Sequence, residues 1–157
     1  DPGTEIGPLV SGTAQTRVRG MIERAAAEGA RVLAGDTRLP DTGRFVAPTV
    51  IADAHIDSEI AQQEIFGPVV SVHPYRTIDE AVEMANATAY GLGGAVFGGD
   101  DDQILRIARR VRTGSIGLAG YRPDINLPFG GVKASGLGRE LGPEAINGYL
   151  TLTSMFV

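Results

Sequence analysis

The chain has 157 residues and a formal net charge of -5; 43% of its residues are hydrophobic, 21% are charged, and none is cysteine. This length and balance are typical of a packed globular protein and exclude an intrinsically disordered one. The acidic charge argues against nucleic-acid binding, and with no cysteine and two histidines we predict neither disulfides nor a metal site.

Residues 1–52 predict one helix and two extended segments. Apolar residues three and four positions apart predict a helix over 13–28, and Gly29 is its stop signal. A short strand over 30–34 and a polar surface loop over 36–44 follow. Residues 45–52 are predicted to be extended, and Pro48 favours an edge position or a break because it lacks a backbone donor. The apolar face of the helix consists of Val18, Met21, Ile22, Ala25 and Ala26.

The next part of the chain predicts a short helix followed by a strand. Ser58 is the expected N-cap of a helix over 59–64, and Gly67 with Pro68 forms the turn after it. Residues 69–72 are apolar apart from one serine and predict a buried strand.

Residues 77–119 predict a regular alternation of helices and strands. Thr77 and Glu80 have the spacing of a capping box for a helix that ends near Asn86. Acidic residues at 100–102 and arginines over 109–112 match the two ends of a second helix, and strands are predicted over 95–97 and 115–119. Strand, helix, strand, helix, strand requires parallel pairing, so we predict an α/β fold with a parallel-sheet βαβαβ core.

The end of the chain has a different pattern. Leu150 and Leu152 alternate with threonines before an apolar terminus, which predicts an extended strand over 149–157 after a domain over 1–148. An exposed apolar strand at a terminus can pair with another chain, and the alternative is an ordinary edge strand.

Two runs of residues are the most distinctive of the chain. One is Glu64-Ile65-Phe66-Gly67-Pro68-Val69, and the other is Pro-Phe-Gly-Gly-Val-Lys-Ala-Ser-Gly-Leu-Gly-Arg-Glu over residues 128–140. Together with residues 1–10, these runs resemble the aldehyde dehydrogenase superfamily, and the resemblance covers essentially the whole chain. It implies part of the catalytic domain: a C-terminal third that begins just downstream of the family's catalytic cysteine.

The resemblance implies a reaction and a cofactor. Family members oxidise an aldehyde to a carboxylic acid by thiol attack, hydride transfer to NAD or NADP, and thioester hydrolysis. The matching glutamate, Glu64, is expected to hold the nicotinamide-ribose hydroxyls, and the matching phenylalanine, Phe66, to pack near the nicotinamide ring. A carboxylate that accepts two hydroxyl donors beside a flat apolar ring is suited to this task. Without the resemblance, composition favours a simple connection in which Phe66 fills the core.

The glycine-rich runs do not match phosphate-binding loops. Val132 stands where the Walker pattern needs a glycine before Lys133, and the runs at 91–93 and 136–138 lack their third glycine. We predict that they form tight turns and close backbone approaches. The resemblance adds that residues 128–140 shape the floor of an active site.

We predict no catalytic residue in this chain. It has no cysteine, no serine lies in a Gly-x-Ser-x-Gly motif, and His55 and His73 are isolated. The chain departs from the family at Ala119, where many members carry asparagine, and over 121–125, where an aromatic residue contacts the aldehyde. The substrate class is therefore not predicted, and no role is assigned to Ala14 or Arg17, which match a glutamine and a lysine near the cofactor in some members.

The complete protein is therefore expected to be an NAD(P)-dependent aldehyde dehydrogenase that assembles as a homo-oligomer through residues 149–157. The isolated chain is expected to be inactive, because the nucleophile and general base lie outside it. The alternative is a non-catalytic binding or assembly module of the same fold; the failed glycine patterns disfavour a flavodoxin-like nucleotide-binding protein. No apolar run approaches the roughly 18 residues of a membrane span, so we expect no membrane partner and a cytoplasmic location.

Overall fold

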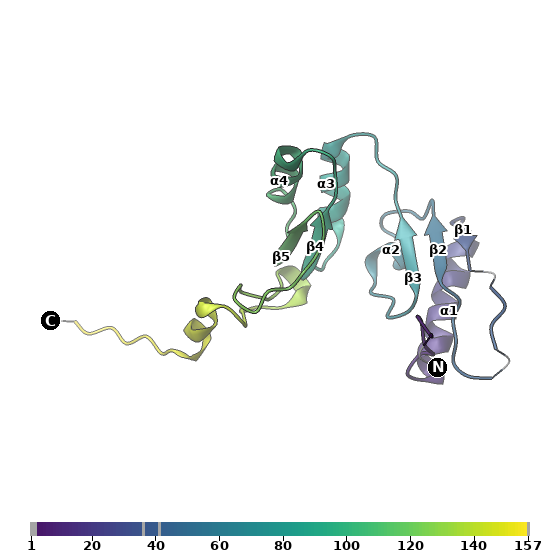
Figure 1. Ribbon diagram of the computed structural model, residues 1–157, viewed down its shortest axis with the longest axis horizontal. Helices are drawn as coiled ribbons and strands as arrows, with labels where there is room; N and C mark the ends of the chain where they lie inside the picture. The colour runs from purple at the N-terminus through teal and green to yellow at the C-terminus, as the bar shows by residue number, and fades with distance from the viewer. Residues whose placement is uncertain (1–2, 36, 41, 157) are drawn as a thin grey trace. The chain divides into compact units, whose positions relative to one another are not determined.

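The computed structural model describes residues 3–35, 37–40 and 42–156 (Figure 1). The chain forms two compact units, residues 1–75 and residues 76–157. The domain predicted over 1–148 therefore includes residues of both units. In the described ranges, no helix combines the length and the apolar character that crossing a membrane requires.

The first unit begins with its longest helix. Helix α1 (Gly12–Ala27) starts at Ser11, whose hydroxyl accepts a hydrogen bond from the Ala14 backbone N–H. Its buried side chains are Val18, Met21 and Ala25, three of the five residues in the predicted apolar stripe. The helix predicted over 13–28 is therefore confirmed.

Three strands form a mixed sheet beside this helix. Strand β1 (Arg31–Ala34) pairs antiparallel with β2 (Thr49–Ala52), and β2 pairs parallel with β3 (Val69–Val72). The predicted break at Pro48 is confirmed, since β2 starts directly after it. Ile51 of β2 packs with residues of α1 in the core. The loop predicted over 36–44 contains no helix or strand in its described residues; residues 36 and 41 lie outside them.

The segment between β2 and β3 differs from its prediction in two ways. Helix α2 (Glu59–Gln62) has Ser58 at its N-cap as predicted, but it ends two residues early, and the Ser58 hydroxyl donates to the His55 carbonyl and makes no capping hydrogen bond. Strand β3 is not buried, because Val70 and Val72 are 53% and 48% exposed. Only Val69 of this strand packs on the core, and the side chains of a strand point alternately to the two faces of a sheet.

The second unit contains two helices and a pair of parallel strands. Helix α3 (Ile78–Ala87) begins at Thr77, whose hydroxyl accepts from the Glu80 N–H, while the Glu80 carboxylate accepts from the Arg76 N–H. Helix α4 (Asp101–Ala108) begins at Asp100 and packs on both strands. The strands are β4 (Gly93–Val96) and β5 (Ser115–Leu118), which pair in parallel.

The predicted α/β class with parallel strands is confirmed, but the predicted pairing is only partly correct. β4 and β5 pair across α4 as expected, whereas β3 belongs to the sheet of the first unit and β4 to that of the second. The alternation along the chain gives the order of the elements. Which strand edges share hydrogen bonds is a non-local property that this order does not specify.

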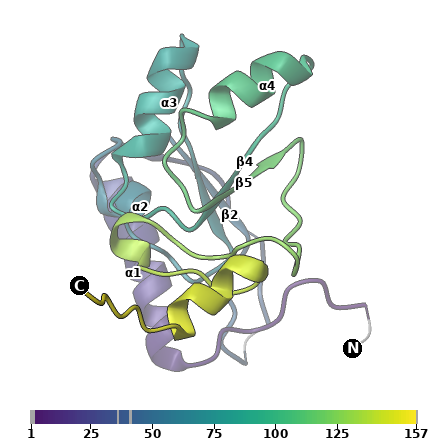
Figure 2. The same cartoon turned by 90° about the vertical axis from the view of Figure 1, so that its left-hand side faces the viewer.

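After β5 the chain contains a loop with an isolated bridge between Phe129 and Glu140, two 3₁₀ turns and a tail. Turns η1 (Lys133–Ser135) and η2 (Pro143–Tyr149) are followed by residues 150–156, which are extended and form no ladder with the described residues (Figure 2). Tyr149 ends η2 and so does not belong to the strand predicted over 149–157, whereas pairing of the following residues with another chain stays a prediction. Residue 157 lies outside the described residues.

Candidate functional site

The predicted cofactor residues lie on the connection between α2 and β3. Glu64 and Phe66 are both exposed, and Phe66 has 70% of its surface open to solvent. Phe66 therefore does not fill the core of the first unit, which the alternative based on composition expected it to do. Within the described part of the chain, the Glu64 carboxylate makes no hydrogen bond or ion pair, so its oxygens are free to accept donors from a ligand.

The backbone of this segment has an unusual conformation. Phe66 has φ of 49°, in the left-handed region that bulky side chains rarely adopt. Gly67 follows it, and a Cβ at this position would lie 2.9 Å from Cγ2 of Val18 on α1. Glycine thus allows the backbone to approach the buried face of α1 directly after Phe66. The helix is the support on which this exposed segment rests.

Arg17 of α1 contacts three residues of the segment. Its Nη1 donates to the Glu64 carbonyl at 3.3 Å, and its Nη2 donates to the Ile65 carbonyl. Its guanidinium carbon lies 5.7 Å from the centre of the Phe66 ring, within the range of a cation–π contact. The resemblance matches Arg17 to a lysine near the cofactor, but no role was predicted from it, because these contacts span 47 residues of the chain.

The chemistry of this surface fits a nicotinamide riboside. An unpaired carboxylate accepts hydroxyl donors, and an exposed aromatic face offers a flat apolar contact for a ring. The described residues contain no group of three or more histidine, cysteine, aspartate or glutamate side chains that could hold a metal.

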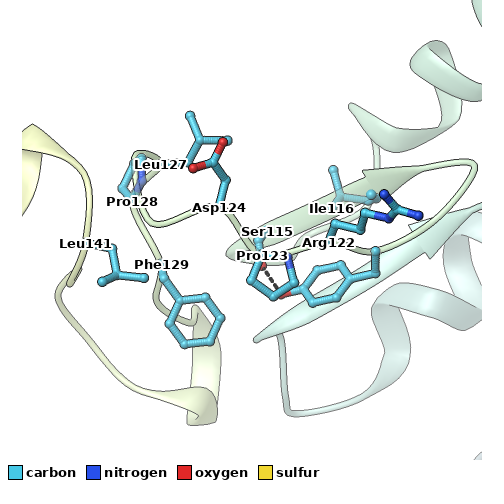
Figure 3. Close-up of a pocket in the computed structure, with 11 residues that line it drawn as sticks. Ser115, Ile116, Arg122, Pro123, Asp124, Leu127, Pro128, Phe129 and Leu141 are labelled. Atoms are coloured by element: carbon cyan, nitrogen blue, oxygen red, sulfur yellow. Dashed lines mark hydrogen bonds between the residues drawn. The ribbon is translucent and has the colours of Figure 1, made fainter.

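The second unit contains a small pocket beside β5. Its cavity volume is about 100 Å³. Phe129 and Leu141 lie on one side of it, and Ser115, Ile116 and Arg122 on the other (Figure 3). The space corresponds to a few water molecules, well below the roughly 300 Å³ at which pockets for drug-sized ligands begin. The pocket can contact part of a small substrate.

Hydroxyl groups order one wall of the pocket. The Ser115 hydroxyl lies 3.2 Å from the Leu92 carbonyl, to which it donates, and 2.7 Å from the Tyr121 hydroxyl. Either of the two hydroxyls can be the donor in this shorter contact, which holds the Tyr121 ring against β5. Gly93 makes room for this ring, since a Cβ there would lie 2.7 Å from the Tyr121 oxygen.

The glycine-rich run over 128–140 is held by contacts within the second unit. Backbone hydrogen bonds join Phe129 and Glu140 in both directions, at 2.7 and 2.8 Å. The Lys133 ammonium donates to the carbonyls of Asn86 and Thr88 at the end of α3, both at 3.0 Å. The Ser135 hydroxyl accepts from the Gly91 N–H at 2.9 Å. These contacts support the predicted structural role and show that Lys133 binds backbone carbonyls.

Other residues considered from the sequence take no part in these sites. His55 is exposed, and its Nδ1 accepts from the Asp57 N–H at 3.3 Å. Ala119, at the position where the resemblance predicts asparagine, has φ of 55°. Asparagine tolerates this left-handed conformation better than alanine does, so the backbone does not explain the alanine.

Comparison with known proteins identifies a family. The model of the aldehyde dehydrogenase family matches residues 1–155. Geranial dehydrogenase of Castellaniella defragrans is 48% identical over 157 residues, which cover 100% of this chain and 33% of that protein. This chain thus spans about a third of the length of the relatives it matches.

Solved structures agree with this match. The aldehyde dehydrogenase of Mycobacterium tuberculosis complexed with NAD+ superposes with a TM-score of 0.89 at 44% identity, over 95% of this chain and 31% of that one. The betaine aldehyde dehydrogenase of Staphylococcus aureus in complex with NAD+ gives a TM-score of 0.88 at 39% identity, over 96% and 31%.

Proposed function

We propose that this chain, which belongs to the aldehyde dehydrogenase family, is the C-terminal portion of an NAD(P)-dependent enzyme that oxidises an aldehyde to a carboxylic acid. The observation that carries the proposal is the exposed pair on the α2–β3 connection. Glu64 has a carboxylate with no partner among the described residues, and Phe66, two residues further along the chain, has an exposed ring. NAD+ complexes of related structures support a nicotinamide cofactor.

In this proposal Glu64 and Phe66 orient the nicotinamide end of the cofactor. When bound, the cofactor supplies the hydride acceptor of the oxidation. The Glu64 carboxylate accepts hydrogen bonds from two ribose hydroxyls, and the Phe66 ring packs against the flank of the nicotinamide riboside. Two acceptor oxygens and a flat wall restrict rotation of the ring, which favours a productive distance between the reacting atoms.

The pocket beside β5 is the proposed contact for the aldehyde. Its lining is mainly apolar, including Ile116, Leu127, Phe129 and Leu141, and these side chains exclude water from the apolar part of a substrate. Asp124 also lines it, but its Oδ1 already accepts from the backbone and side chain of Asn126, both at 2.9 Å. A relative named for geranial, an aldehyde, supports this substrate class.

In this proposal the nucleophilic thiol comes from outside this chain, which has no cysteine, and the general base comes from there as well. The test compares the 157-residue chain with the longer protein that contains it. With an aldehyde and NAD+ or NADP+, the longer protein should form the reduced nicotinamide and the chain alone should not. Turnover by the chain alone, or no turnover by the longer protein over a panel of aldehydes, would contradict the proposal.

The second candidate function is a non-catalytic binding or assembly module of the same fold, which needs no thiol. The two functions differ in what precedes Asp1 in the gene. An in-phase upstream reading frame that encodes a cysteine and a glycine-rich nucleotide-binding region favours the enzyme; a start codon at this position favours the module.

A further inference from the structure

Arg17 connects the rigid helix α1 to the exposed segment with the two proposed cofactor residues. We infer that Arg17 is a positioning residue, which holds the backbone of Glu64, Ile65 and Phe66 in the conformation that presents the Glu64 carboxylate and the Phe66 ring to a nicotinamide cofactor. The inference rests on the proposed function. It adds Arg17 as a residue that positions the two proposed cofactor residues through contacts with the backbone of the segment.

The segment needs an external support. Phe66 has φ of 49° and is 70% exposed, so neither its intrinsic preference nor burial of its ring holds it there. A bulky residue in the left-handed region is strained, and such a conformation persists only when its surroundings impose it. Helix α2 has already ended at Gln62, so the carbonyls of Glu64 and Ile65 lie beyond its hydrogen-bond ladder.

The guanidinium of Arg17 meets this need with its geometry. Two of its nitrogens donate to two successive carbonyls, those of Glu64 and Ile65, and its central carbon lies over the Phe66 ring, 5.7 Å from the centroid. A planar fork can make both donations and the ring contact at once, whereas the point charge of a lysine cannot. Arg17 Nη1 also lies 3.5 Å from the Met21 sulfur, which ties the side chain to a buried residue of α1.

The chain offers a matched control on the same helix. Arg19 is also exposed, and its Nη2 donates to a backbone carbonyl, that of Phe45, at 3.1 Å. The variants Arg17→Met and Arg19→Met therefore remove the same charge from α1, and each breaks contacts to backbone carbonyls. Only the first removes the support of the Glu64–Phe66 segment.

The first experiment measures amide hydrogen exchange of the 157-residue chain without cofactor. In Arg17→Met, amides of the peptide over 64–69 should exchange about tenfold faster than in the unchanged chain, as expected for losing a cation–π contact and hydrogen bonds to a charged group. Arg19→Met should leave this peptide unchanged, and Arg17→Lys should give an intermediate rate. Equal rates in the Arg17→Met and Arg19→Met variants would overturn the inference.

The second experiment measures cofactor affinity in the longer protein, by quenching of protein fluorescence or by calorimetry. Arg17→Met should weaken NAD(P) binding roughly tenfold, and it should add little in a protein that already carries Glu64→Gln, because both changes act on one contact. Unchanged affinity in Arg17→Met beside weakened affinity in Glu64→Gln would overturn the inference but support the proposed function. If Glu64→Gln itself binds normally, the assignment of the cofactor site fails, whatever the exchange rates show.

Discussion

Lys133 is the only lysine of the chain, and its replacement separates two opposing contributions to stability. Its ammonium donates to the carbonyls of Asn86 and Thr88, which the end of α3 leaves without helical partners. Hydrogen bonds to a charged group and a cation at a helix C-terminus are together worth about 2 kcal/mol at a half-buried site. Lys133 also has φ of 57°, which is unfavourable for a residue with a Cβ.

The two contributions predict different results for two substitutions. Lys133→Ala removes the ammonium and keeps the strained φ, so it should lower the free energy of unfolding by about 2 kcal/mol. Lys133→Gly removes the same ammonium but relieves the strain, so it should be about 1 kcal/mol less destabilising than Lys133→Ala.

The assay is amide hydrogen exchange over α3 and β4, which reports the opening of the second unit by itself, supported by urea unfolding of the whole chain. Equal losses in the two variants would refute the strain argument. No loss in Lys133→Ala would show that the contacts of the ammonium contribute nothing.

Three further results are expected. Gly93→Ala places a Cβ 2.7 Å from the Tyr121 oxygen, so it should displace that ring and weaken its hydrogen bond to Ser115; unperturbed ring resonances of Tyr121 in an NMR spectrum would argue against this packing. The hydrogen bond from Arg24 lowers the pKa of Glu59 below its ordinary value of 4.5. This pair should therefore stabilise the chain above that pH, and its contribution should be lost as the pH falls through the lower pKa of the folded chain. If the urea midpoints of the unchanged chain and of Glu59→Gln depend on pH in the same way, the account is contradicted. Deleting residues 151–157 from the longer protein, which removes the highly exposed Leu152 and Phe156 (96% and 95%), should yield smaller assemblies in size-exclusion chromatography; an unchanged elution volume would refute the proposed oligomerisation segment.

Local signals in the sequence predicted the elements well. The apolar stripe of α1, the cap at Thr77 and the strand over 69–72 depend on neighbours within a few residues, and all three are present. Pairing between distant strands depends on which edges meet in space. For this reason the sequence did not show that β3 and β4 belong to separate sheets.

The candidate site was predictable to the extent that a motif marks it. Glu64 and Phe66 follow from one short run of residues, but the conformation of Phe66 and its contact with Arg17 do not. That contact joins a helix to a connection 47 residues away, and the match of Arg17 to a lysine near the cofactor in some family members did not specify it. Lys133 is a similar case, since its partners lie 45 and 47 residues before it.

The hydride-transfer step of the longer protein tests the role of the pair at 64 and 66 most directly. Single-turnover oxidation of an aldehyde and of its C1-deuterated form should be measured with the unchanged protein and with Glu64→Gln. The account predicts slower hydride transfer and a larger isotope effect in the variant, because an amide oxygen is a weaker acceptor for the ribose hydroxyls than a carboxylate. The same rate and the same isotope effect in both proteins would contradict it.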